Sequence, residues 1–337
     1  MNFRFVSQGL LCLSLLMPVA AHAQTVTIKL GTLAPEGSTW HSLLKEMGQR
    51  WSDASGGKVK LKIYPGGVAG GEGDMVRKMR VGQLNAGALT VVGLQEIEAA
   101  PQAIATPGLI TSQEEWDYAF PRIAPTWDKK FIDKGFVPLM WGDTGWVHLF
   151  LKKEITSVKD LKGVKMFAWS GDPVAVKAWS AAGFQPVVIS SVDILPSLST
   201  GMIEGFGATP IAAFTARFYD AAKYMPELSW GHMPGGTVVT KAVWDKIPGD
   251  VQVKLLAISR EIGAKVNAEV KRMSDDSLEQ MKKNGLKVIR LKDSERKAWF
   301  DMAERTWPLV RGGMVQAADF DAVIKVRNEF RAQKGKK

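Results

Sequence analysis

The segment Ser157-Val158-Lys159-Asp160-Leu161-Lys162-Gly163-Val164-Lys165-Met166-Phe167 lies near the middle of the chain and opens a regular alternation of strands and helices. The apolar run at 164–168 predicts a buried strand. Asp172-Pro173 follows as a helix N-cap with proline at the first helical position, which predicts a helix to about Ala182. Residues 187–189 predict the next strand. This alternation indicates an α/β fold with a largely parallel sheet.

The same alternation extends in both directions along the chain. The expected strands are short apolar or alternating runs at 26–30, 59–63, 85–92, 136–141, 147–151 and 203–207. The expected helices have apolar residues at helical spacing and follow Ser38, follow the glycine-rich loop 66–73, and occupy 192–199, 251–283, 294–306 and 319–333. The helix at 251–283 is long and amphipathic, and Asn284-Gly285 ends it as a C-cap. We therefore expect two α/β units in series and a helical C-terminus.

The first 23 residues have the pattern of a secretory signal peptide. Arg4 precedes an apolar run at 10–21, and Ala21-His22-Ala23 forms a cleavage site before Gln24. The single cysteine, Cys12, lies inside this segment, so cleavage leaves a mature protein without disulfides, thiolate metal sites or a cysteine nucleophile. No later segment is long and apolar enough to cross a bilayer, and we expect an exported, soluble protein.

The balance of charge is basic, with 44 Lys and Arg against 34 Asp and Glu and a net charge of +10. The basic residues are scattered over the expected helices and gather only at 327–337, which we interpret as a solvated, frayed tail. Export also argues against nucleic acid as a partner. The composition, 46% hydrophobic and 23% charged, is that of an ordinary globular protein.

Motifs for metal, nucleotide or hydrolytic chemistry are missing from the sequence. His41, His148 and His232 lie far apart and have no ligand-like spacing, so no metal is expected. The loop 66–73 lacks the Gly-Lys-Ser/Thr of a P-loop and is interpreted as a turn. Neither Gly-x-Ser-x-Gly nor His-Glu-x-x-His occurs. We expect no cofactor and no catalytic residue.

Five blocks of the sequence resemble, in order, the DctP-type solute receptors of tripartite ATP-independent periplasmic (TRAP) transporters. They are Gly31-Thr32-Leu33-Ala34-Pro35-Glu36-Gly37-Ser38, Tyr64-Pro65-Gly66-Gly67, the segment 77–85 that ends in Val81-Gly82-Gln83-Leu84-Asn85, Asp160-Leu161-Lys162-Gly163-Val164-Lys165, and Leu198-Ser199-Thr200-Gly201-Met202-Ile203-Glu204-Gly205. The resemblance covers nearly the whole mature chain, and five blocks in the right order are a specific signal.

The resemblance implies a two-lobed, periplasmic-binding-protein-like fold (type II-like), joined by crossing strands and a long hinge-spanning helix. We predict lobe I at 24–144 plus 236–273, lobe II at 145–235 plus 274–320, and a C-terminal helix end with a basic tail at 321–337. The resemblance also implies a periplasmic receptor and not an enzyme. It would trap a small-molecule ligand by hinge closure and then dock on the membrane subunits of a TRAP permease. We expect it to act as a monomer.

The sequence departs from the family at the positions where the resemblance places the ligand clamp. The family's signature ends in an arginine that binds the ligand's carboxylate, and here that position is Phe167. The resemblance places Val147 where the family has a second arginine, Ala208 where it has an asparagine, and Thr90 near an acidic or polar position of the family. Because a buried carboxylate needs a paired cation, the ligand is expected to present apolar or aromatic surface at Phe167.

Aromatic residues concentrate around the same part of the sequence. Trp146, Trp169 and Phe206 flank the clamp positions, and Trp230 lies near the predicted crossover to the first lobe. Such rings can stack on a planar or cationic group, but for any single one of them a place in the core is the more common outcome. An anion could alternatively bind the helix N-terminus at 170–172, where Asp172 would oppose it. We therefore predict an organic acid with apolar or aromatic bulk, and expect Phe167→Arg to weaken its binding.

Two other functions share this fold. An exported sensor would signal ligand occupancy to a partner instead of a permease, and an exported hydrolase would turn its ligand over. Fold alone does not separate these. A neighbouring permease gene pair would favour transport, a sensor kinase the sensor, and turnover in a substrate screen the hydrolase.

Overall fold

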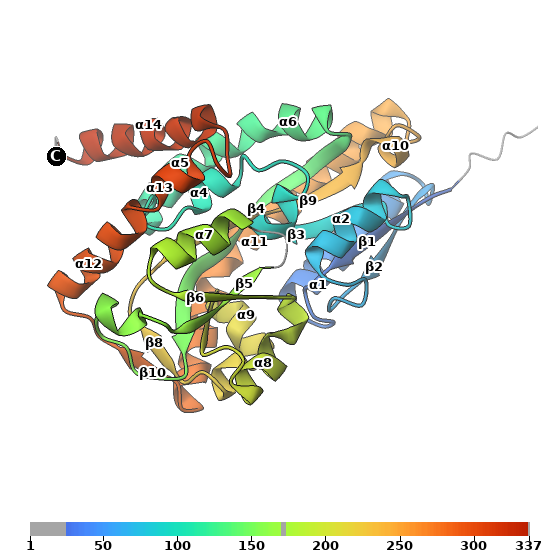
Figure 1. Ribbon diagram of the computed structural model, residues 1–337. Coiled ribbons are helices and arrows are strands. Elements are labelled where there is room, and N and C mark those ends of the chain that lie inside the picture. Colours follow the sequence, from blue (N-terminus) through green and yellow to red (C-terminus); the bar gives the residue numbers. More distant parts are fainter. Residues whose placement is uncertain (1–24, 170–172, 336–337) are drawn as a thin grey trace, which may run out of the picture.

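The structure is a computed structural model that describes residues 25–169 and 173–335 (Figure 1). The predicted signal peptide at 1–23 and the helix N-terminus considered at 170–172 lie outside the described residues.

The first lobe is built on three parallel strands in the order β2-β1-β3: β1 (Val26–Thr32), β2 (Val59–Tyr64) and β3 (Ala86–Thr90). Helices α1 (Thr39–Ala54) and α2 (Glu72–Arg80) connect them, and the Ser38 hydroxyl caps α1 by accepting a hydrogen bond of 3.2 Å from the His41 N–H. The segment that follows folds into α3 (Val91–Gln95), α4 (Gln102–Ala105), α5 (Gln113–Ile123) and α6 (Trp127–Asp133).

The second lobe is built on β7-β5-β6: β5 (Lys165–Trp169), β6 (Gln185–Ile189) and β7 (Gly205–Ala208). The segment 157–167 forms a 3-10 turn, η2 (Val158–Leu161), followed by β5, as its pattern predicts. Helices α7 (Pro173–Ala181), α8 (Ile194–Thr200) and α9 (Pro210–Thr215) connect and follow these strands. Two short parallel strands, β8 (Tyr224–Pro226) and β10 (Lys287–Ile289), join this lobe where β8 pairs with β4.

Two long antiparallel strands join the lobes: β4 (Phe136–Leu151) and β9 (Gly231–Thr240). The complete order is β2-β1-β3-β9-β4-β7-β5-β6, so both crossing strands lie between the two parallel groups. The sequence predicted two strands around Gly142–Gly145, and this was wrong, because β4 is continuous. Its hydrogen bonding to β9 continues through the glycines, with a register shift between Asp143 and Gly145 that forms a β-bulge.

Helix α11 (Gly249–Lys283) packs against α1 of the first lobe, against β4, and against α9 of the second lobe. It is the hinge-spanning helix that the resemblance implied. Buried apolar residues recur along it, among them Leu255, Ile262, Val266 and Val270. The chain continues from β9 through α10 (Lys241–Trp244) into α11, and after β10 it ends in α12 (Asp293–Glu304), α13 (Trp307–Val310) and α14 (Ala317–Lys334).

The interpretation of 327–337 as a frayed tail is corrected for the described residues up to 335. Helix α14 extends to Lys334 and packs against α5 and α4 (Figure 1). The Arg327 side chain is only 9% exposed. Arg331 Nε donates a hydrogen bond of 2.5 Å to Glu115 Oε1, because the buried carboxylate on α5 needs a cationic partner.

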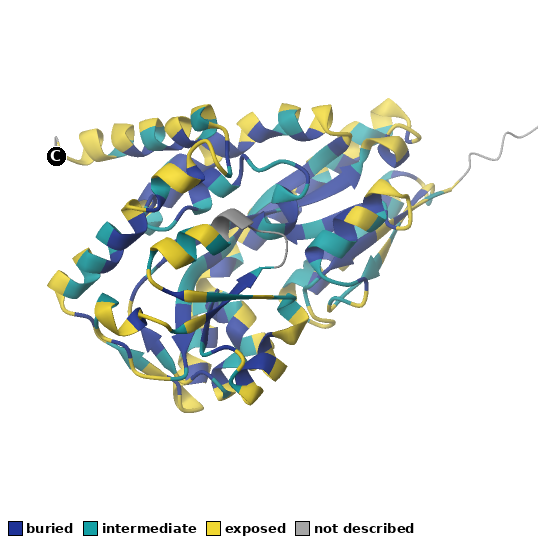
Figure 2. Ribbon diagram, in the orientation of Figure 1, coloured by how far each residue is buried: buried dark blue, intermediate teal, exposed yellow. Residues whose placement is uncertain are grey.

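Buried apolar side chains of the described residues form four clusters. Figure 2 shows buried residues along the strands and exposed residues on the outer helices. The large buried rings include Trp51 and Trp127 in the first lobe and Phe150 and Phe206 in the second. Among the described helices, none combines the length and apolar character that a membrane crossing requires.

Candidate functional site

A cavity of about 590 Å³ lies between the lobes, next to the crossing strands. The first lobe contributes residues from β1, α1, α2 and β3, and the second lobe contributes residues from β5, α8, β7 and α9. The crossing strands and α11 complete its wall through Met140, Asp143, Met233 and Val266. Because both lobes supply wall residues, a molecule in this cavity would contact both lobes at once, and its size suits a small organic molecule.

The wall of the cavity is mainly apolar. Three aromatic side chains face it from different elements: Trp40 on α1, Trp169 at the end of β5, and Phe218 after α9. Among the described lining residues there is no lysine or arginine, and the charged groups are two carboxyl groups, those of Glu72 and Asp143. The cavity therefore offers apolar surface, hydroxyl groups and carboxyl oxygens, but no cationic side chain.

Glu72, at the start of α2, has a structural role that accounts for its burial. Its carboxylate accepts hydrogen bonds from the Thr90 N–H and Thr90 hydroxyl, both at 2.7 Å, and from the Gly93 N–H at 2.8 Å. Burial raises the pKa of Glu72, although these three donors act in the opposite direction. The carboxylate thus ties α2 to the end of β3, and its hydrogen-bonding capacity is largely used.

Asp143 lies in the β4 bulge, where both crossing strands pass the cavity. Its side chain is only 9% exposed. Asp143 Oδ1 accepts a hydrogen bond of 2.6 Å from the Gly145 N–H. The backbone N–H of Asp143 donates to Asn267 Oδ1 on α11 at 2.7 Å. Its carboxyl group has no cationic partner among the described residues, in contrast with Glu115 on α5.

The electrostatics around Asp143 follow from its burial. Burial raises the pKa of Asp143 to about 7, and the negative charge of Asp117 adds to this while the Gly145 N–H opposes it. His232 Nδ1 lies 3.4 Å from Asp143 Oδ1, but burial lowers the pKa of His232 to about 3. The ring is therefore neutral at physiological pH, and it stacks on Trp116 with a centroid distance of 3.7 Å.

Three of the predicted site residues line the cavity. Thr90 and Ala208 contribute from the ends of β3 and β7, and Trp169 contributes from β5. The Thr90 hydroxyl is already engaged, since it donates to Glu72 and accepts from the Val92 N–H at 3.2 Å.

The other five predicted residues are not among the described residues that line the cavity. Phe167 is 3% exposed in the core of the second lobe, 5.1 Å between ring centroids from Trp169, and Phe206 stacks on Phe150 in the same core. Val147 and Trp230 belong to another cluster of that lobe. Trp146 packs against the first lobe's core, and its indole N–H donates to Gln113 at 3.0 Å. The structure thus brings three of the eight residues to the cavity and packs the other five into the apolar clusters of the lobes.

Sequence reasoning did not single out Glu72, Asp143, Trp40 or Phe218. Asp143 was placed in a turn between two strands, and Glu72 in a glycine-rich loop. A signal existed for Asp143, because an aspartate between two glycines inside a long apolar stretch marks an interruption of a buried strand. Trp40 gave no signal that distinguished it from a core tryptophan, since it lies at helical spacing with other apolar residues.

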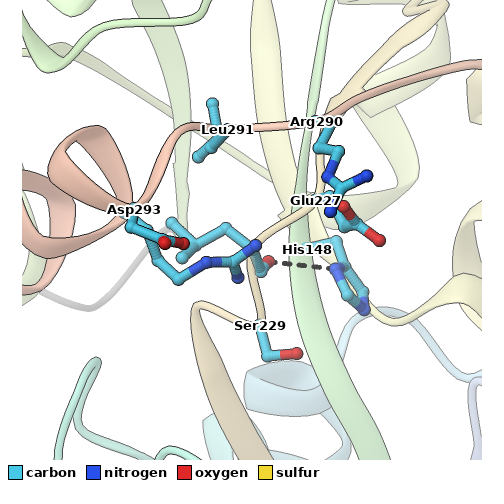
Figure 3. A pocket seen from close by; sticks show the side chains of 8 residues that line it. His148, Glu227, Ser229, Arg290, Leu291 and Asp293 are labelled. Atoms are coloured by element: carbon cyan, nitrogen blue, oxygen red, sulfur yellow. Dashed lines mark hydrogen bonds between the residues drawn. The ribbon is translucent and has the colours of Figure 1, made fainter.

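A second, polar pocket of about 550 Å³ opens on the second lobe (Figure 3). In the close-up, Arg290, Glu227 and His148 lie on one side of the pocket and Asp293 on the other, with Ser229 below. The ring of His148 makes a hydrogen bond of 3.0 Å through Nδ1 to the Leu228 carbonyl oxygen. Charges of both signs line this pocket, and it belongs to one lobe. A hinge motion between the lobes would therefore not enclose its contents.

Among the described residues, no group of three or more His, Cys, Asp or Glu is placed to hold a metal ion. The candidate site is the cavity between two lobes that the crossing strands and a long helix connect. This is the architecture of receptors that enclose a solute by hinge closure.

Comparison with known proteins shows the family. The profile of the DctP family, "Bacterial extracellular solute-binding protein, family 7", matches residues 30–311, so the chain belongs to this family of solute-binding receptors, which are not enzymes. A solute-binding protein of Roseobacter denitrificans is 27% identical over 330 residues, which cover 95% of this chain and 93% of that protein. The C4-dicarboxylate-binding periplasmic protein DctP of Rhodobacter capsulatus is 24% identical, with 86% and 88% covered.

The solved structures share the fold. A TRAP periplasmic solute-binding protein from Pseudomonas putida F1, with bound D-glucuronate, superposes with a TM-score of 0.82 at 22% identity and covers 90% of this chain and 96% of that chain. The two-lobed α/β fold with a helical C-terminus that the sequence predicted is confirmed.

Proposed function

We propose that this protein is the periplasmic receptor of a TRAP transporter and captures a small organic acid with apolar or aromatic bulk. The ligand would be enclosed between the lobes by hinge closure and delivered to the membrane permease. The observation that carries this proposal is the cavity of about 590 Å³ whose mainly apolar wall comes from both lobes. The name of the Rhodobacter relative and the D-glucuronate bound to the Pseudomonas protein support an organic acid.

The acid group of the ligand would be bound by hydroxyl groups in this protein. The oxygens of Thr32 and Thr209 accept local backbone hydrogen bonds at 3.2 and 3.4 Å, which leaves each hydroxyl proton free to donate into the cavity. Thr237 and Ser191 line the same cavity. Hydroxyl donors bind a carboxylate more weakly than a bidentate guanidinium does, so apolar contact must supply more of the affinity.

Phe167 and Phe206 would affect ligand binding indirectly, by holding in place the wall residues that contact the ligand. Phe167 supports Trp169, and Trp169 lines the cavity. The wall position nearest the family's arginine is thus an indole with an aromatic ring behind it. This supports a ligand that presents apolar or aromatic surface to the second lobe.

Residues 1–23 would act as a cleaved signal peptide that exports the chain to the periplasm, and the receptor would act there as a monomer. The family description, "extracellular solute-binding protein", supports the location. The predicted lobe boundaries remain part of this proposal.

The experiment that tests the proposal is a thermal-shift panel on residues 24–337. The panel compares C4-dicarboxylates and sugar acids with aromatic and branched aliphatic acids, and with neutral solutes of the same size. A ligand at about one hundred times its dissociation constant stabilises the folded state by about 2.7 kcal/mol, a shift of several degrees. We expect the aromatic and branched acids to give the largest shifts. Larger shifts from dicarboxylates would contradict the apolar bulk, and no shift from any solute would contradict the receptor function.

A further inference from the structure

The Asp143 carboxyl group is the one polar feature of the cavity that the proposed function leaves unexplained. Oδ1 accepts the Gly145 N–H, and this is the one hydrogen bond that the carboxyl group receives from the described residues. Glu72, the other carboxyl group of the cavity, has three donors. An ionised carboxylate that is nine-tenths buried is costly unless a cation pairs with it.

The described residues around Asp143 do not supply that cation. From β9 the facing group is His232, which is neutral, and its Nδ1 is buried without a hydrogen-bond partner. From α11 the facing residue is Asn267, whose amide oxygen accepts the Asp143 N–H. From α5 the nearest charge is that of Asp117, which is also negative. No lysine or arginine is among the described residues that line the cavity.

The rest of the cavity wall suits a positively charged group on the ligand. Trp40, Trp169 and Phe218 line it, and the face of an aromatic ring attracts an ammonium group. A ligand hydroxyl would give Asp143 one hydrogen bond, whereas an ammonium group would give a hydrogen bond and neutralise the buried charge.

We propose that Asp143 is a specificity-determining residue that binds a protonated amine of the solute. This rests on the proposed function and narrows it to an organic acid that also carries an ammonium group on an apolar body. Its carboxylate would face the threonine hydroxyls, and its ammonium group would face Asp143 at the crossing strands. Because Asp143 lies in the β4 bulge between the lobes, the contact would form where hinge closure is centred.

The test uses two pairs of probes that differ only by the amine. L-phenylalanine is compared with 3-phenylpropanoate, and L-leucine with 4-methylpentanoate, by calorimetric titration of residues 24–337. In the wild type we expect the amine to tighten binding by about 30-fold or more within each pair, the effect typical of a buried charge pair. In Asp143→Asn this preference should disappear, while Asp53→Asn, an exposed aspartate on α1, should retain it.

The pH dependence provides a second readout. Affinity for the amine-bearing probes should fall as the pH drops below about 7, because the Asp143 carboxyl group then takes up a proton. A protonated Asp143 that instead donates to a ligand carboxylate would give tighter binding at low pH. That result, or an amine preference that survives in Asp143→Asn, would overturn the inference.

Failure of the inference is distinguishable from failure of the proposed function. If acids without an amine bind as tightly as their amine-bearing partners, the receptor function stands and the role of Asp143 is refuted. If no organic solute of any class binds, both are refuted.

Discussion

At the scale of single residues, no lysine or arginine is among the described residues that line the cavity, whereas a carboxylate clamp is built on a cationic side chain. The sequence predicted Phe167 at the position of the family's signature arginine, and the structure buries Phe167 against Trp169. The charges that remain are negative, and they have different environments. Glu72 is satisfied by three donors, whereas Asp143 accepts one backbone N–H and has its pKa raised to about 7. Charge selection in this cavity therefore depends on Asp143.

Asp143 should also make the stability of the ligand-free protein depend on pH. Because the folded pKa is raised above the unfolded value of 3.8, the folded state holds a proton that the unfolded chain releases. Below about pH 4 the group is protonated in both states and costs no stability. As the pH rises from there to about 7, the free energy of unfolding falls by about 4 kcal/mol and stays at the lower value. Urea unfolding should therefore show Asp143→Asn gaining stability relative to the wild type between pH 5 and pH 8.

The comparison between variants is needed because two histidines act in the opposite direction. Burial lowers the pKa of His148 to about 4 and that of His232 to about 3, so both destabilise the folded state as the pH falls below 6.5. The contribution of His148 cancels in the difference between Asp143→Asn and the wild type. His232 contacts Asp143, so its contribution cancels only well above pH 6.5, where the ring is neutral in the folded and the unfolded state. A difference that stays constant from pH 5 to pH 8 would mean that Asp143 is not perturbed in the folded state.

At the scale of elements, the bulge in β4 lets one strand serve both lobes. Gly145 adopts a φ of 101°, which disfavours residues with a side chain, and a Cβ there would lie 3.1 Å from Ser274 Oγ on α11. The register with β9 shifts at this point, between Asp143 and Gly145. The strand thus changes direction where it passes the cavity and remains paired with β9 on both sides.

Gly145→Ala should therefore destabilise the protein by about 2 kcal/mol or more, through backbone strain and contact with α11. Gly163→Ala is the matched control, because Gly163 also has a positive φ, of 76°, but a Cβ there would meet nothing within 4 Å. Urea unfolding of both variants separates the cost of backbone strain from the cost of the contact with α11. Equal losses of stability would show that the contact with α11 contributes nothing and that strain alone accounts for the cost.

At the scale of the whole molecule, two helices connect parts of the chain that are far apart in sequence. α11 packs on both lobes, and α14 returns from the C-terminus to pack on α5 and α4. Arg331 pairs with Glu115, which lies 216 residues earlier. Burial raises the pKa of Glu115, but hydrogen bonds from Arg331 and Thr111 outweigh it and the net pKa is lowered. The ion pair therefore stabilises the fold at pH values above the pKa that Glu115 has in the unfolded chain. This stabilisation is lost as the pH falls through the lowered pKa of the folded state.

Arg331→Ala should lower the free energy of unfolding by about 1 to 3 kcal/mol, because it leaves a buried carboxylate without its cation. Lys325→Ala provides the control, since Lys325 is exposed on the same helix, and it should change stability by less than about 0.5 kcal/mol. Thermal or urea unfolding at neutral pH measures both. Equal stability of the two variants would show that α14 is held by apolar packing alone.

Much of the fold could be predicted from local patterns. The alternation around 157–167 predicted β5, α7 and β6, the apolar repeat from Val251 predicted most of α11, and Ser38 marked the start of α1. The continuity of β4 could not be predicted, because Gly142 and Gly145 signal a turn unless a neighbouring strand pairs with them. That neighbour, β9, lies about ninety residues later. The helices between Val91 and Asp133 gave no clear signal and were not predicted.

The candidate site was predicted only in part, for a related reason. Side chains two residues apart on a strand point to the same face, so Phe167 and Trp169 share a face, as do Phe206 and Ala208. Strand periodicity assigns the face, but it does not say how far along the strand the cavity begins. The packing of the lobes decided that the second member of each pair lines the cavity while the first is covered.

The sequence by itself determined the family, the α/β class and the long hinge-spanning helix, and it predicted a clamp position without an arginine. These properties rest on residue types, their spacing and local hydrogen bonding, which act within a short stretch of chain. Only the tertiary structure decided that Asp143 lies at the wall of the cavity without a cationic partner among the described residues, and that Phe167 packs in the core against Trp169. Burial and charge pairing depend on groups brought together from distant segments, as β4, β9, α5 and α11 meet around Asp143.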